Sequence, residues 1–111
     1  MSEQRPATLT DDPVLVRFRK ALEEMYGQRL ERVVLFGSRA RGDARPESDY
    51  DIAVFLRDMD DRFAEIYRLA DLSSNVIDET DEVVHAMPYH AGAYVERTPL
   101  MREIRLEGID L

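Results

Sequence analysis

Apolar residues recur along the first part of the chain at intervals of three and four. From Val14 to Met25 this spacing places them on one face of a helix, which would pack against a core. The helix is expected to begin with Asp12 as its N-cap and Pro13 in its first turn, a combination that favours helix starts. Gly27 is a plausible stop, because glycine readily ends helices.

The same helical spacing returns twice in the later part of the chain. A second amphipathic helix is expected from about Asp60 to Ser73, where the run Ser73-Ser74-Asn75 would end it. We expect one side of it to carry Phe63, Ile66, Tyr67 and Ala70. A third helix is expected over Leu100–Leu106, with Thr98 as N-cap and Gly108 as its end.

Three shorter apolar runs predict strands. Val33–Phe36 is continuously apolar, as in a strand buried on both faces. Residues 49–56 open with carboxylates and become apolar, and Val83–Met87 forms a third run that Pro88 should end. The order is therefore helix, strand, strand, helix, strand, helix, which indicates an α/β or α+β protein.

Composition sets the class of protein. With 111 residues we expect one domain over 1–111, in which the polar, proline-containing residues 1–10 are flexible. No apolar run approaches the roughly 20 residues that span a bilayer, the N-terminus lacks a signal-peptide core, and there are no cysteines, so we expect a cytoplasmic protein with no membrane partner. A net charge of −8 argues against general nucleic-acid binding.

Candidate chemistry is concentrated where the first two strands meet the intervening loop. Gly37 and Ser38 follow the first strand, and such a turn can offer backbone N–H groups and a hydroxyl to a phosphate. Asp49 and Asp51 are two residues apart, so in a strand both face the same side, with Cα atoms roughly 6.6 Å apart. Mg²⁺ often takes one or two protein carboxylates together with nucleotide phosphates. The arginines between residues 39 and 45 form a local basic spot that suits a small anionic ligand.

The two segments together resemble a known signature. Gly37-Ser38-Arg39-Ala40-Arg41-Gly42, followed by Ser48-Asp49-Tyr50-Asp51-Ile52, is similar to the motif of the nucleotidyltransferase superfamily related to DNA polymerase β. More narrowly it resembles the minimal nucleotidyltransferases, which are often paired with HEPN-domain toxins. The resemblance implies a small mixed sheet with helices packed mainly on one face. It also implies a Mg²⁺-dependent transfer of a nucleoside monophosphate, AMP from ATP in our expectation, to a hydroxyl of a HEPN-type toxin, for which the chain would be the antitoxin.

The resemblance also assigns roles to residues. Catalysis and metal binding would fall to Asp49, Asp51 and a third acid from a later strand, and such a site can hold two Mg²⁺ ions. For the third acid, Glu82 is the best positional match and Asp81 is the next. Nucleotide binding would fall to Gly37, Ser38, Arg39, Arg41 and Ser48.

A second hypothesis comes from the imperfect match of the third acid. The family usually flanks that acid with apolar residues on both sides, whereas Thr80 and Asp81 precede Glu82 here. The alternative is therefore a binding module with weak or absent catalysis that neutralises a HEPN-type ribonuclease by forming a complex with it. His85 and His90 are a weak candidate metal pair, and the more ordinary role for His85 is a packed or partly exposed group on one face of the strand.

Overall fold

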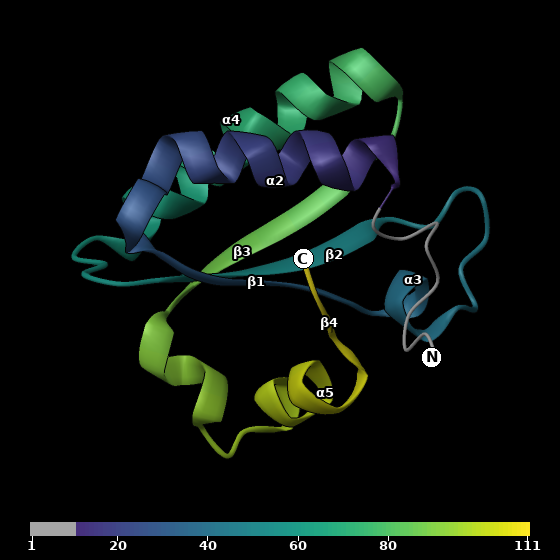
Figure 1. The fold of residues 1–111 in the computed structure, drawn as a ribbon. Helices are drawn as coiled ribbons and strands as arrows, with labels where there is room; N and C mark the ends of the chain where they lie inside the picture. The colour runs from purple at the N-terminus through teal and green to yellow at the C-terminus, as the bar shows by residue number, and fades with distance from the viewer. Residues whose placement is uncertain (1–10) are drawn as a thin grey trace.

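A four-stranded mixed sheet forms the centre of the computed structural model, which describes residues 11–111 (Figure 1). The strands lie in the order β3-β2-β1-β4. Strand β1 (Leu30–Phe36) runs antiparallel to β2 (Tyr50–Leu56) and to the short β4 (Ile109–Asp110). Strand β3 (Val84–His90) runs parallel to β2. The expected flexibility of residues 1–10 lies outside the described residues.

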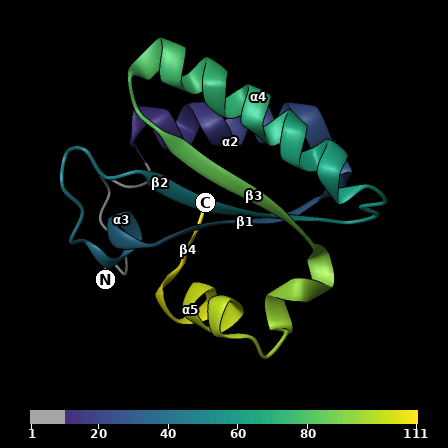
Figure 2. The ribbon, with the colours of Figure 1, turned by 180° about the vertical axis from the view of Figure 1, so that it is seen from behind.

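Helices cover the two faces of the sheet unequally. The two long helices, α2 (Pro13–Tyr26) and α4 (Arg62–Thr80), pack side by side on one face (Figures 1 and 2). The shorter α5 (Pro99–Glu107) and the 3-10 helix η2 (Ala91–Val95) lie on the other. The predicted fold class, a mixed sheet with helices mainly on one face, is confirmed. A short helix α3 (Ser38–Arg41) follows β1, and a 3-10 turn η1 (Gly27–Arg29) precedes it.

Strand β2 determines which side chains reach which face. Ile52, Val54 and Leu56 belong to the core beneath α2 and α4, whereas Ala53 and Phe55 belong to the core beneath α5. Because side chains alternate across a strand, Asp51 starts the face that α5 covers and the preceding tyrosine starts the opposite face. Asp51 therefore lies at the start of a face that becomes apolar with Ala53 and Phe55.

The helix ends follow the capping residues read from the sequence. The Asp12 carboxylate accepts a hydrogen bond from the backbone N–H of Val14 at 2.8 Å, and the Thr98 hydroxyl accepts one from the N–H of Met101 at 3.1 Å. Each bond satisfies an N–H group that the helix itself leaves without a partner.

Helix α4 corrects the sequence prediction in both length and orientation. It continues to Thr80 instead of ending at Ser73, and Phe63 and Tyr67 are more than 70% exposed. The buried face consists of Glu65, Leu69, Leu72, Ser73 and Val76. Because this face includes the charged residue Glu65, the hydrophobic pattern of the sequence did not indicate it.

Hydrogen bonds explain how Glu65 can be buried. Its carboxylate accepts bonds from the Tyr26 hydroxyl at 2.9 Å, from Arg29 at 3.0 Å and from Arg68 at 3.0 Å. Burial opposes ionisation of the carboxyl, but these donors outweigh it, and the pKa of Glu65 lies below its ordinary value.

The third strand and the chain end also differ from the prediction. Strand β3 runs through Pro88 to His90, because an edge strand tolerates a residue without an N–H group. The pairing of Val34 and Leu35 with β4 was missed, since a two-residue strand carries no periodic signal. None of the helices within residues 11–111 is long and apolar enough to cross a membrane.

Candidate active site

The turn after β1 touches the carboxylate of the neighbouring strand. Phe36 pairs with Asp51 in the antiparallel register of β1 and β2, which brings Gly37 beside the Asp51 side chain. Gly37 has a φ of +78°, and a Cβ atom at this position would collide with the Asp51 carboxylate oxygen. Glycine is therefore needed twice here, for its backbone conformation and for the close approach.

Two carboxylates lie together at the start of β2. Asp49 is exposed, and the Asp51 side chain is 34% exposed at the edge of the α5 face. Partial burial raises the pKa of Asp51, and the negative charge of Asp49 raises it further, while His85 and Arg41 act in the opposite direction. A cation bound between the two acids would relieve their repulsion.

An imidazole stands beside this pair. Strand β3 places His85 directly opposite Asp51 in the parallel register, with His85 Nδ1 3.8 Å from Asp51 Oδ1. The His85 side chain is 67% exposed, so of the two expected positions, packed or partly exposed, it takes the exposed one. The sequence did not predict this proximity, because only the β2–β3 register shows that His85 lies opposite Asp51. His90 lies at the far end of β3, where it is 3.6 Å from Glu96, and the two histidines do not form a site together.

The predicted nucleotide-binding arginine Arg39 holds the loop before β2. Its guanidinium donates to the backbone carbonyl of Ser48 at 2.7 and 3.0 Å and to that of Pro46 at 3.3 Å. It also lies over the Tyr50 ring at 3.9 Å, and the Tyr50 hydroxyl donates to the helix-capping Asp12 at 2.8 Å. These contacts fix the position from which the two carboxylates project.

Ser48 takes part in the same loop. Its hydroxyl accepts a hydrogen bond from the backbone N–H of Arg45 at 2.9 Å, and its own N–H donates to the Arg45 carbonyl at 2.9 Å. Nucleotide binding by Ser48 and Arg39 stays a prediction, and the contacts seen here are those of residues that position the site.

Arg41 lies on the opposite side of α3, toward α5. Its guanidinium contacts Asp43 and Glu107, each at 3.3 Å, and its charge lowers the pKa of Asp51. Arg41 is thus a cation at the rim of the carboxylate pair, and it connects that rim to the end of α5.

The structure does not bring Glu82 to the two aspartates. Glu82 precedes β3, and its carboxylate lies 3.6 Å from Arg39, on the Tyr50 side of the sheet. Asp81 has a φ of +62° and forms the C-cap of α4, so neither acid belongs to the strand as we expected. Within residues 11–111 there is no group of three or more acidic or histidine side chains arranged to hold a metal ion. Whether Glu82 has a catalytic role stays a prediction.

The donor set that does come together fits one nucleotide-bound cation. Mg²⁺ commonly takes one or two carboxylates from a protein and completes its shell with phosphate oxygens and water. Asp49 and Asp51 are carboxylates of this kind, and the Gly37-Ser38 turn lies against the side chain of Asp51.

Comparison with known proteins agrees with this arrangement. The family model described as a nucleotidyltransferase domain matches residues 15–103. A Methanocaldococcus jannaschii protein carrying the name "Putative protein adenylyltransferase" is 39% identical over 46 residues, which are 41% of this chain and 46% of that protein. The match thus spans less than half the length of this curated relative.

Solved structures share the fold. A chain in a crystal structure of a toxin–antitoxin complex with AMP-PNP superposes with a TM-score of 0.60 at 24% identity, covering 84% of this chain and 68% of that one. A chain in the complex of tri-AMPylated Shewanella oneidensis HEPN toxin with MNT antitoxin gives a TM-score of 0.53 at 20% identity, covering 87% and 70%. With the family model covering most of the sequence, the chain belongs to the nucleotidyltransferase domain family.

Proposed function

We propose that this protein transfers AMP from ATP to a hydroxyl group of a partner protein, with Mg²⁺ as cofactor. The partner would be a HEPN-type toxin, and the modification would silence it. Three findings support the proposal: the nucleotidyltransferase family model, the adenylyltransferase name of the Methanocaldococcus relative, and the shared fold with chains from HEPN toxin–antitoxin complexes.

The side chains of the site have separate roles in this reaction. Asp49 and Asp51 would hold Mg²⁺, which neutralises phosphate charge, and the Gly37-Ser38 turn would receive the terminal phosphates. The acceptor oxygen forms a bond to the α-phosphorus, the bond from that phosphorus to the bridging oxygen breaks, and pyrophosphate leaves. The acceptor proton passes to a nearby base. Two candidate bases lie side by side, the Asp51 carboxylate and the His85 imidazole, and Asp51 Oδ1 is 3.8 Å from His85 Nδ1.

One observation supports the proposal most directly: the Gly37 turn and the Asp51 carboxylate, which come from the two halves of the motif, are in contact. A Cβ atom at position 37 would collide with the Asp51 carboxylate, so this arrangement of turn and acid requires glycine there. The test is intact-mass analysis of a HEPN-domain protein from the same genome after incubation with this protein, ATP and Mg²⁺. The proposal predicts acceptor masses that increase by whole AMP units and no increase with the Asp49→Asn/Asp51→Asn variant.

A second candidate function follows from the position of Glu82. Because the described residues supply two clustered acids and not three, the chain could neutralise the toxin by complex formation alone. In that case the toxin would be bound and silenced while its mass stayed unchanged.

A further inference from the structure

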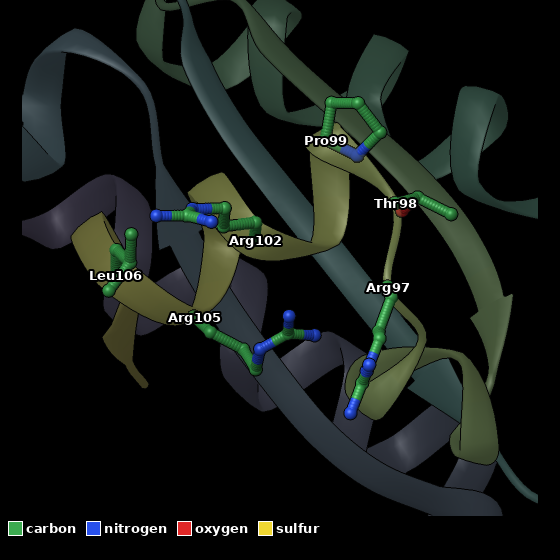
Figure 3. Close-up of a pocket in the computed structure, with 6 residues that line it drawn as sticks. All are labelled: Arg97, Thr98, Pro99, Arg102, Arg105 and Leu106. Carbon is green, nitrogen blue, oxygen red and sulfur yellow. The ribbon is translucent and has the colours of Figure 1, made fainter.

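Three arginines surround a hollow beside α5 that the proposed reaction does not use. The hollow has a volume of about 680 Å³, within the range of roughly 300–1,000 Å³ typical of ligand pockets. Its lining consists of Arg97, Thr98, Pro99, Arg102, Arg105 and Leu106, and we call it the arginine groove (Figure 3). The lining contains no acidic side chain, although the protein as a whole has a net charge of −8.

Two of these guanidinium groups are available to a ligand. Arg105 donates to the backbone carbonyls of Tyr94 at 2.6 Å and Glu96 at 2.9 Å, so it joins α5 to the segment before it. In contrast, the guanidinium groups of Arg97 and Arg102 are exposed and have no hydrogen-bond or ion-pair partner within residues 11–111. Figure 3 shows Arg105 reaching from α5 toward Arg97.

The groove adjoins the candidate active site. Its last residue, Leu106, precedes Glu107, which contacts Arg41 at 3.3 Å at the rim of the carboxylate pair. Helix α5 has nine residues and is therefore about 13 Å long. An extended peptide of only a few residues would span that length, so one peptide could reach from the active site along the groove.

The chemistry of the lining favours a protein ligand over a nucleic acid. The lining has no aromatic ring on which a base could stack, and stacking platforms are usual where single strands bind. It offers instead the exposed aliphatic side chain of Leu106. A long polyanion would also be repelled by the net charge of −8 on the protein as a whole, whereas a short acidic stretch need face only the arginines.

We propose that the arginine groove binds an acidic segment of the acceptor protein, next to the hydroxyl group that receives AMP. This inference rests on the proposed function in taking the acceptor to be a protein. The groove would increase the local concentration of the acceptor without contacting ATP, so its loss should weaken acceptor binding and leave nucleotide binding unchanged.

The experiment measures binding of a glutamate–tyrosine copolymer by fluorescence anisotropy, with a twelve-nucleotide oligoadenylate as the competing ligand class. The groove variant is Arg97→Glu/Arg102→Glu, which alters two exposed side chains and adds a favourable negative charge near the start of α5. The matched control is Arg19→Glu/Lys20→Glu on α2, across the sheet, which changes net charge equally. Binding of Mg–ATP is measured for every protein.

The expected result is salt-sensitive copolymer binding that weakens at least tenfold in the groove variant and less than threefold in the control, with unchanged affinity for Mg–ATP. Equal losses in the two variants, no loss in either, or no copolymer binding by the wild-type protein would overturn the inference. Stronger binding of oligoadenylate than of copolymer, lost in the groove variant, would identify a nucleic-acid surface instead. Failure of the wild-type protein to bind Mg–ATP would count against the proposed function and not against the groove.

Discussion

Replacing Gly37 with alanine should disable the site by displacing Asp51. The added Cβ would occupy the space of the Asp51 carboxylate, and the backbone φ of +78° with ψ of −160° lies in a region that glycine alone adopts readily. That conformation costs about 1–3 kcal/mol for other residues. Because the carboxylate must also move, we expect Mg–ATP to bind roughly 10–100-fold more weakly, the range seen when a supporting contact of a metal ligand is lost.

Gly27→Ala separates the two effects. Gly27 also has a positive φ, of +53°, but a Cβ there meets nothing within 4 Å and lies far from the carboxylates along the chain. Both variants should unfold at lower temperature, whereas isothermal titration with Mg–ATP should show weakened binding for Gly37→Ala alone. If the two variants bind Mg–ATP with the same affinity, contact between the turn and Asp51 does not support the nucleotide site.

Three further predictions test other parts of the account. The double variant Asp49→Asn/Asp51→Asn should abolish Mg²⁺-dependent ATP binding, which isothermal titration measures. Its unfolding temperature should stay nearly unchanged in thermal unfolding, because both carboxylates lie outside the core. His85→Ala should lower kcat for transfer to the same acceptor more than Glu82→Gln does, because the His85 imidazole faces Asp51 and Glu82 contacts Arg39 instead. A larger loss in Glu82→Gln would restore Glu82 as the third acid. Glu65→Ala should reduce the free energy of unfolding by about 1–3 kcal/mol, because a buried tyrosine hydroxyl loses its acceptor, and chemical denaturation measures it.

The buried carboxylate of Glu65 also predicts how the stability of the fold changes with pH. The pKa of Glu65 is lower in the folded protein than in the unfolded chain, so its stabilising contribution is present above the unfolded value of about 4.3 and disappears as pH falls through the folded value. Wild-type stability should therefore decline on acidification below about pH 4.5, and Glu65→Ala should decline less steeply over the same range. Parallel curves for the two proteins would show that this carboxylate does not contribute.

Local signals were enough to predict much of this molecule from its sequence. Helix caps such as Asp12 and Thr98 act on the next few residues, and the alternation along β2 follows from strand geometry alone. The contact between Gly37 and Asp51 is a longer-range relationship that the sequence did not predict, although the family resemblance assigned both residues to one site.

The features that the sequence concealed depend on tertiary contacts. The buried face of α4 was misassigned because Glu65 becomes compatible with the core only when Tyr26, Arg29 and Arg68 converge on it. The position of His85 depends on the register between two strands that are far apart along the chain.

The central claim is that the carboxylate pair beside the Gly37 turn directs attack on the α-phosphorus of ATP. It is tested most directly by incubating the protein and Mg²⁺ with a HEPN-domain acceptor and ATP labelled at either the α- or the γ-phosphate. The account predicts that the acceptor gains the α-label and not the γ-label, and that Asp49→Asn/Asp51→Asn gains neither. Transfer of the γ-label, or a silenced acceptor that carries no label at all, would contradict it.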